Sequence, residues 1–132
     1  MAELTAQEVE TRRVIEQLYA AYLSGDTDGM ANLMSEDVWV KFLGRRDFRG
    51  REQARRFFGE NGPLLIDLDF VVEELIVDGA HAAAIWSESA RTAAGAVYRN
   101  HGVDVFEVRD GEIVFVHENN DINVHRHHFG KA

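Results

Sequence analysis

The sequence predicts an α+β domain in which three N-terminal helices are wrapped by a curved, mainly antiparallel sheet. Apolar residues recur at helical spacing in the first half of the chain. The second half contains apolar strands joined by the turn dipeptides Asp78-Gly79 and Asp110-Gly111. Helices followed by hairpins are typical of a sheet that packs against helices. With 132 residues, of which 45% are hydrophobic, the chain fits one domain, residues 1–132.

The first helix is predicted from a capping box, in which Thr5 and Glu8 bond to each other's backbone at the helix start. Apolar and aromatic side chains then follow at helical spacing, namely Ile15, Leu18, Tyr19, Tyr22 and Leu23. The helix should end at residues 24–26, where Gly25 interrupts the pattern.

A second, shorter helix is expected to begin at Asp26 or Thr27, because either side chain can cap its amino end. Its buried side is predicted to be Met30, Leu33 and Met34. Residues 35–37 are then expected to turn the chain, and residues 38–43 to form a strand.

A third helix is predicted after Gly50 and should end near residues 59–63, which include the only proline, Pro63. Its apolar face contains Ala54, Phe57 and Phe58. The rest of the chain is predicted to form two hairpins, one of residues 69–77 with 81–88 and one of residues 97–108 with 113–121. A sheet that closes on helices at one end leaves a cone, and an unfilled cone is a small-molecule site.

Composition excludes several classes of function. The chain has 14 basic and 23 acidic residues and a net charge of −9, which disfavours nucleic acid and anionic membranes as partners. It contains no cysteine, so thiol chemistry and disulfides are excluded. No signal peptide and no apolar run of about 20 residues is recognisable, and we therefore expect a cytoplasmic protein.

Two carboxylates are expected on the inner face of the last hairpin. If Asp104 faces the interior, alternation gives it the neighbours Tyr98, Asn100, Gly102 and Phe106. On the partner strand the same argument groups Val114, Val116, Glu118 and Asn120, although a bulge would reverse the sides. A carboxylate among aromatic side chains has a raised pKa, which suits a general acid or base. Glu118 is the first catalytic candidate and Asp104 the second.

Further residues are candidates for contact with a substrate: Asn100, Tyr19, Tyr98, Trp39, Phe42, Phe58 and Trp86. Each has a structural alternative. Glu118 can pair with Arg99, Asp104 and Asn100 can be satisfied core groups, and the aromatic rings can simply fill the core. Asp121 or His117 replaces Glu118 at the pocket if the strand is bulged.

Two charged clusters are expected to be solvated. The tail His125-Arg126-His127-His128 lacks the ligand spacing of a metal site, so it is interpreted as a terminal segment in solvent. The arginines near the third helix form either a solvated face or a site for an acidic group: Arg45, Arg46, Arg49, Arg51, Arg55 and Arg56. No metal or cofactor motif is present in the sequence.

Several segments together resemble the nuclear-transport-factor-like superfamily, with its cystatin-like fold. They are residues 22–26, 33–38, 48–51, 103–108 and 110–113, and residues 98–101 and 117–124 also resemble phenazine biosynthesis proteins of the A/B type. The superfamily includes ketosteroid isomerase, limonene epoxide hydrolase, scytalone dehydratase and the SnoaL-like polyketide cyclases. The resemblance covers nearly the whole chain and implies a homodimer formed through the outer sheet face, where Val103 and Val105 point outward.

The resemblance transfers site residues only in part. Where ketosteroid isomerase has a tyrosine and two aspartates, this chain has Leu18, Phe42 and Asp104, and Tyr19 would point about 100° away from Leu18. The acidic residue of limonene epoxide hydrolase and the phenazine proteins falls at Glu118, whereas the phenazine histidine falls at Phe57.

Together these observations predict a cofactor-independent enzyme that shifts a proton on a hydrophobic, cyclic or polyketide-like molecule, with isomerase, cyclase or dehydratase chemistry. The alternative is a non-catalytic domain of the same fold, which binds a small molecule or serves in association.

Overall fold

The computed structural model describes residues 3–42, 47–61 and 65–129. Its elements are α1 (Ala6–Ser24), α2 (Thr27–Asn32), β1 (Met34–Phe42), β2 (Phe48–Arg49), α3 (Arg51–Asn61), β3 (Leu65–Asp78), β4 (His81–Thr92), β5 (Val97–Arg109), β6 (Glu112–Asn120) and α4 (Ile122–Phe129). The strands form one sheet in the order β2-β1-β6-β5-β4-β3. All neighbours are antiparallel except β1 and β6, which are parallel.

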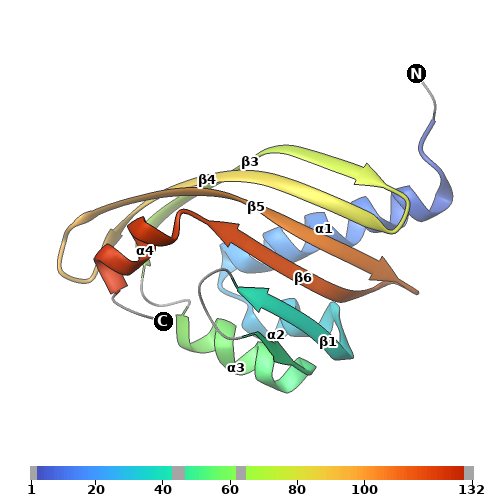
Figure 1. The fold of residues 1–132 in the computed structure, drawn as a ribbon, viewed down its shortest axis with the longest axis horizontal. Helices are drawn as coiled ribbons and strands as arrows, with labels where there is room; N and C mark the ends of the chain where they lie inside the picture. Colours follow the sequence, from blue (N-terminus) through green and yellow to red (C-terminus); the bar gives the residue numbers. More distant parts are fainter. Residues whose placement is uncertain (1–2, 43–46, 62–64, 130–132) are drawn as a thin grey trace.

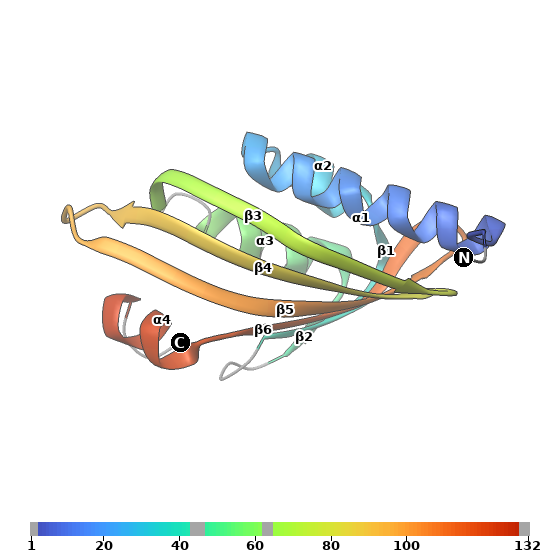
Figure 2. The ribbon, with the colours of Figure 1, turned by 90° about the horizontal axis from the view of Figure 1, so that it is seen from above.

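The sheet bends around the helices, as the sequence predicts. Figure 1 shows α1 running along the sheet behind β5 and β6, with α2 and α3 beside β1. Viewed from above in Figure 2, α1 and α2 lie on the concave side of the long strands β3, β4 and β5. The α+β cone of three N-terminal helices and a curved, mainly antiparallel sheet is confirmed.

Helix α1 begins and ends where the sequence predicts, whereas α2 begins as predicted but ends at Asn32, before Leu33 and Met34. Thr5 and Glu8 form the capping box of α1, and Gly25 ends the helix in the left-handed conformation at φ 73°. The Asp26 side chain accepts the Gly29 N–H at 2.8 Å and caps α2. The expected turn at residues 35–37 is wrong, because β1 already begins at Met34, with an irregular register between Met34 and Trp39.

Both predicted hairpins are present. The β3–β4 hairpin turns at Gly79, which has φ 60°, and the β5–β6 hairpin turns through Asp110 and Gly111 at φ 51° and 76°. The predicted inner face of β6 is wrong at its start. On β5, Glu107 pairs with Phe115 but the next residue, Val108, pairs with Ile113, so the register shifts by one residue. As a result Ile113 rather than Val114 is buried with Val116.

The C-terminal histidine segment is not a solvated tail, and this expectation is corrected. It forms α4, whose start is capped by Asp121 through an Oδ1 that accepts the Asn123 N–H at 3.1 Å. His128 and Phe129 pack on the ring of Tyr98, and His125 is buried near Phe42. The helix therefore covers one end of the sheet beside β5 (Figure 1).

Of the arginines near α3 that the structure describes, Arg51 and Arg55 form ion pairs, whereas Arg49 lies over the ring of Trp39. Arg51 pairs with Glu112 at 3.1 Å and also donates to the Met34 carbonyl, while Arg55 pairs with Asp28. The expectations for Leu43, Pro63, Arg45 and Arg46 concern residues outside the described ranges.

The tightest part of the core lies at one end of the sheet, which we call the closed end. Its residues are fully buried and come from α1, β5 and β6: Thr11, Val14, Ile15, Val108 and Ile113. Thr11 donates its hydroxyl to the Gly79 carbonyl at 2.9 Å, which fastens α1 to the β3–β4 turn. On the outer face, Val103 and Val105 are only half-buried, and dimerisation through that face stays a prediction.

Candidate active site

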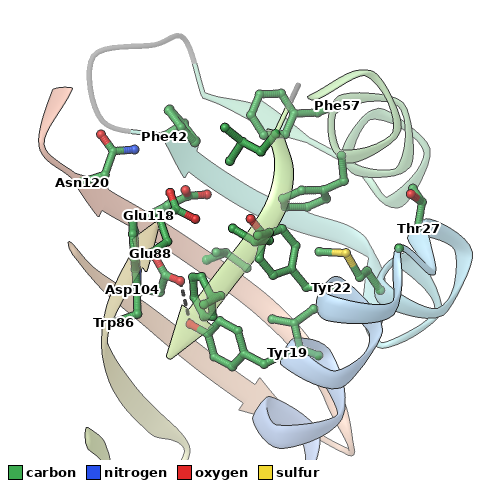
Figure 3. A pocket seen from close by; sticks show the side chains of 18 of the residues that line it. Tyr19, Tyr22, Thr27, Phe42, Phe57, Trp86, Glu88, Asp104, Glu118 and Asn120 are labelled. Carbon is green, nitrogen blue, oxygen red and sulfur yellow. Dashed lines mark hydrogen bonds between the residues drawn. The ribbon is translucent and has the colours of Figure 1, made fainter. Parts of the chain in front are cut away.

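A cavity of about 420 Å³ opens between the C-terminal half of α1 and the sheet, at the end opposite the closed end. We call this part of the molecule the open end. Its walls are largely aromatic, and they include Tyr19, Tyr22, Phe70, Trp86, Tyr98 and Phe106. Three carboxyl groups also line the cavity, those of Glu88, Asp104 and Glu118 (Figure 3).

Asp104 and Tyr19 form a buried hydrogen-bonded pair at the bottom of the cavity. The Tyr19 hydroxyl donates to Asp104 Oδ2 at 2.6 Å, and the two side chains are only 9% and 8% exposed (Figure 3). Burial and the neighbouring Asp104 charge raise the pKa of Tyr19 far above its usual value, so Tyr19 remains a donor. Burial also raises the pKa of Asp104, and the hydrogen bond from Tyr19 offsets part of that rise.

The Trp86 indole is a second neighbour of the Asp104 carboxyl group and lowers its pKa. Asp104 Oδ1 and Trp86 Nε1 are both buried. Trp86 occupies this place because Gly102, its cross-strand neighbour, has no side chain: a Cβ there would lie 2.7 Å from Trp86 Cζ2. The glycine at residue 102 therefore makes room for the Trp86 indole beside Asp104.

Glu118 lies directly across the β5–β6 ladder from Asp104, and across the β1–β6 ladder from Phe42. Side chains of directly opposed residues stand about 5 Å apart on the same face of a sheet. The Glu118 charge raises the pKa of both Tyr19 and Tyr22, which places its carboxylate toward α1. The predicted pair of inward carboxylates is thus brought together.

A third carboxylate, Glu88 on β4, was missed by the sequence interpretation. Burial and the Asp104 charge raise the pKa of Glu88 to about 7, while a hydrogen bond with Tyr22 lowers it. The alternation of β4 could have revealed it, since Trp86 was expected to face inward and Glu88 is two residues further along the strand. Tyr22 was read only as a helix-face residue, yet it also lines the cavity.

Most predicted contact residues line the cavity. Tyr98, Phe42, Phe58 and Trp86 are among its walls. Tyr19, which was also predicted as a contact residue, lines the cavity as well, and so does its neighbour Leu18, because α1 lies along the cavity.

Trp39 does not line the cavity, so its predicted placement is wrong. Along β1 the buried side chains are Val38, Val40 and Phe42, and Trp39 therefore points to the opposite face. There its ring packs against Phe115 and under Arg49, and its Nε1 donates to Asp47 at 2.7 Å.

Asn100 is buried but supports the structure rather than the cavity wall. Its Nδ2 donates to the Tyr98 hydroxyl at 2.9 Å, and its Oδ1 accepts the Asp121 N–H at 3.0 Å. These bonds connect β5 to the start of α4. Asp121 caps α4, and His117 points with Lys41 toward the outer face, so neither replaces Glu118 in the cavity.

His125 and Asn120 complete the polar part of the walls. Asn120 Oδ1 is buried without a hydrogen bond among the described residues, and His125 comes from α4. Within the described ranges, no group of three His, Asp or Glu side chains is arranged to hold a metal ion. No described helix combines the length and apolar character needed to cross a membrane.

Comparison with known proteins gives one family match. Residues 15–116 match the family model described as the SnoaL-like domain. A search of curated proteins finds no significant match.

Solved structures share the fold along nearly the whole chain. A SnoaL-like protein from Jannaschia sp. CCS1 is 16% identical with a TM-score of 0.87, and the match covers 100% of this chain and 99% of that one. An LEH-like epoxide hydrolase of Mycobacterium tuberculosis is 18% identical (TM-score 0.76; 88% and 86% covered). A second M. tuberculosis protein, solved in complex with estradiol-17β-hemisuccinate, is 17% identical (TM-score 0.76; 87% and 96% covered). At these identities the likeness establishes the fold.

Proposed function

This chain belongs to the SnoaL-like domain family, and from that premise we propose that it is a small-molecule enzyme whose carboxyl groups move a proton on a hydrophobic, cyclic or polyketide-like substrate. The reaction is an isomerisation, cyclisation or dehydration, in which a proton leaves one atom of the substrate and is delivered to another. The chain's own side chains supply the acid and the base.

The observation that carries this proposal is the grouping of three carboxyl groups in one apolar cavity. Glu88, Asp104 and Glu118 come from three adjacent strands, and the raised pKa values of Glu88 and Asp104 show that their charged forms are disfavoured. Carboxyl groups whose pKa values lie near neutrality can both give and take protons at physiological pH. A purely structural core would not retain them, because each costs stability when ionised.

The roles follow from the partners of each group. Asp104 lines the cavity and is held by Tyr19 through Oδ2, and in this proposal its carboxyl group gives a proton to a substrate oxygen. Glu118, which stands across from Asp104, then removes or returns the proton on the neighbouring carbon. In this proposal Glu118 is the principal acid or base, Asp104 the second, and Glu88 a third group that exchanges protons near pH 7.

The size and walls of the cavity support a ring-shaped substrate. A volume of about 420 Å³ lies within the range of small-molecule sites, and aromatic walls favour flat apolar molecules. Neighbours of the same fold include an epoxide hydrolase and a protein complexed with a steroid derivative, which is consistent with such a ligand.

The test is a screen of cyclic ketones and polyketide-like compounds with the wild-type protein and the Glu118→Gln and Asp104→Asn variants. Both substitutions keep the side-chain volume and remove the proton-transfer group. We expect each to lower turnover at least about 100-fold without loss of fold. Glu74→Gln, on the exposed side of β3, is the matched control and should keep full turnover. A folded Glu118→Gln variant with full turnover would contradict the assignment.

A second candidate function is binding without catalysis. Leu18 and Phe42 favour this candidate, and both line the cavity. The resemblance to ketosteroid isomerase places a catalytic tyrosine and a catalytic aspartate at these two positions, and this chain has apolar residues there instead. In that case the wild-type protein binds ring compounds in the same screen and returns every one of them unchanged.

A further inference from the structure

Five ring side chains form a continuous row along one end of the cavity, which we call the aromatic belt. Phe57 of α3 contacts Phe42 of β1, with ring centroids 5.4 Å apart, and Phe42 contacts His125 of α4 at 5.9 Å. His125 contacts Phe129 at 5.1 Å, and Phe129 contacts Tyr98 of β5 at 5.3 Å. All five side chains line the cavity, and rings at these separations touch. The belt is therefore one connected part of the cavity wall.

Helix α4 supplies the middle of the belt. His125 and Phe129 are four residues apart, so they lie on the same face of α4, and that face meets the cavity. The strands at the two ends of this part of the belt, β1 and β5, are not neighbours, because β6 lies between them in the sheet. Since α4 follows β6 directly and lies beside β5 (Figure 1), it bridges the two strands across the end of β6. Without the two α4 side chains, the row of rings would be interrupted between Phe42 and Tyr98.

Asn100 holds the start of α4 against the belt. Its side chain is buried, its Nδ2 donates to the Tyr98 hydroxyl at 2.9 Å, and its Oδ1 accepts the Asp121 N–H at 3.0 Å. Asp121 in turn caps α4 through an Oδ1 that accepts the Asn123 N–H at 3.1 Å. One buried amide thus links a ring of the belt to the residue that caps α4. The position of Phe129 therefore depends on Asn100 as well as on ring packing.

The Tyr98 end of the belt lies away from the opposed carboxyl groups of Asp104 and Glu118. Glu118 pairs with Asp104 on one side and with Phe42 on the other, so these three residues form one row across the sheet. Tyr98 precedes Asp104 by six residues, which corresponds to about 20 Å along β5. In the other direction β5 leads to the closed end, where Val108 is fully buried. A molecule whose polar group meets the two carboxyl groups therefore extends its far end toward the belt.

We propose that α4 sets the length of the ring compound that the cavity accepts, with Phe129 as the specificity-determining residue and Asn100 as the residue that positions α4. The rings of the belt occupy the far part of the cavity, which leaves room for two linked rings rather than three. The distal ring of the substrate packs against the belt, which favours a flat aromatic ring there. This inference rests on the proposed function, because it names the substrate class of the same site.

The chain provides its own reporter for the test of this inference. It has two tryptophans, of which Trp86 lines the cavity and Trp39 lies on the opposite face. In a Trp39→Phe variant, which serves as the reference protein, all tryptophan fluorescence comes from Trp86. Circular dichroism and urea unfolding check that the reference protein keeps the native fold.

The experiment titrates the reference protein with 4-phenylcyclohexanone and with 4-(4-biphenylyl)cyclohexanone, which is one ring longer. We expect the shorter ketone to bind about 10-fold tighter, because Phe129 obstructs the third ring of the longer one. Adding Phe129→Ala to the reference removes this obstruction, and the ratio of the two dissociation constants should shift by at least about 10-fold in favour of the longer ketone. His127→Ala is the matched control, because His127 is an exposed residue of the same helix and is not part of the cavity wall. It should leave the ratio unchanged.

Asn100→Ala in the same reference tests the positioning role. It removes both bonds that link β5 to α4, so the ratio should shift in the same direction as with Phe129→Ala. A loss of stability alone would weaken the binding of both ketones and leave their ratio unchanged. Asn100→Asp keeps an acceptor for the Asp121 N–H and a partner for the Tyr98 hydroxyl, and it should restore the ratio of the reference protein. A folded Asn100→Ala variant with an unchanged ratio would show that Asn100 does not position α4.

Two outcomes would overturn the whole inference, and they differ in what else they affect. If both ketones change Trp86 fluorescence and Phe129→Ala leaves the ratio of their dissociation constants unchanged, α4 does not set the length of the ligand, while the proposed function stands. If neither ketone changes Trp86 fluorescence or releases heat in calorimetry, the cavity is not a site for such rings and the proposed function fails with the inference.

Discussion

The closed end and the open end of the cone are built from the same elements in opposite ways. At the closed end, α1, β5 and β6 contribute Ile15, Val108 and Ile113, which are 0% exposed. At the open end, the same three elements contribute Tyr19, Asp104 and Glu118 around a cavity. One turn of α1 separates Ile15 from Tyr19, so the change from a packed core to a cavity wall takes place within about 6 Å along the helix.

The contrast shows that the closed end stabilises the fold, whereas the open end contains groups whose burial lowers its stability. The closed end consists of well-packed aliphatic groups and a satisfied Thr11 hydroxyl. The open end contains carboxyl groups with raised pKa values, and Asn120 Oδ1 is buried there without a hydrogen bond among the described residues. Substitutions at the two ends should therefore change stability and ligand binding separately.

The largest effect on stability is expected for Ile15→Ala at the closed end. It removes a fully buried side chain and leaves a void between α1 and the sheet, so the free energy of unfolding should fall by about 4 kcal/mol. Urea unfolding measures this, and ligand affinity should stay unchanged. A loss below about 1 kcal/mol would show that the closed end does not dominate stability.

Gly102→Ala tests the boundary between the two ends. The added Cβ would overlap the Asn119 carbonyl and lie 2.7 Å from Trp86 Cζ2, so strands and indole must shift. We expect a loss of about 2 to 3 kcal/mol together with weaker ligand binding, because Trp86 is displaced. The free energy of unfolding and the Trp86 emission maximum report the two effects. An unchanged emission spectrum would mean that Gly102 does not position Trp86.

Glu88→Gln should stabilise the open end at high pH. The native protein binds more protons than the unfolded chain between the ordinary Glu pKa of 4.5 and about 7, so stability is lost as pH rises through this window. The variant lacks this loss. The difference in the free energy of unfolding between the variant and wild type should therefore be about 2 kcal/mol more favourable to the variant at pH 8 than at pH 5. Thermal or urea unfolding at both pH values measures the gain, with Glu74→Gln as the exposed control. Equal differences at the two pH values would contradict the raised pKa.

Tyr19→Phe is expected to have the smallest effect. It removes the donor to Asp104 Oδ2 while it keeps the ring against Phe70 and Phe106, so the loss of stability at pH 8 should be about 1 kcal/mol. Since the hydrogen bond lowers the pKa of Asp104, the variant should raise that pKa further. A carboxyl titration followed by NMR checks the direction, and a lowered Asp104 pKa would contradict the pairing.

Much of the fold could be predicted because its signals are local. The capping box at Thr5 and Glu8, the glycine at residue 25 and the Asp-Gly turns each act through neighbouring backbone. The alternation of β5 also placed Tyr98, Asn100 and Asp104 correctly inside. What failed depends on long-range packing. The bulge opposite Val108 moved Ile113 inward, and α4 is held by contacts with Tyr98 and Phe42 that no local pattern reveals.

The candidate site could be predicted only where strand alternation sufficed. Asp104 and Glu118 lie on the two strands of one hairpin, and alternation along those strands predicted both. Glu88 lies on the preceding hairpin, two residues after Trp86, and alternation along β4 from Trp86 would have predicted it too. Trp39 was expected inside on its aromatic character alone, although its neighbours Val38 and Val40 already occupy the inner face. The meeting of Tyr19 with Asp104 spans 85 residues and depends on where α1 lies on the sheet, which the sequence does not specify.

The central claim is that the open end holds carboxyl groups that exchange protons near neutral pH. The most direct measurement is an NMR titration of the side-chain ¹³C carboxyl signals between pH 3 and pH 9, with the Glu88→Gln and Asp104→Asn variants used for assignment. The structure predicts a midpoint of about 7 for Glu88 and a midpoint above the usual Asp value for Asp104. Midpoints at the ordinary values, 4.5 for Glu88 and 3.8 for Asp104, would contradict the claim and the proposed proton transfer with it.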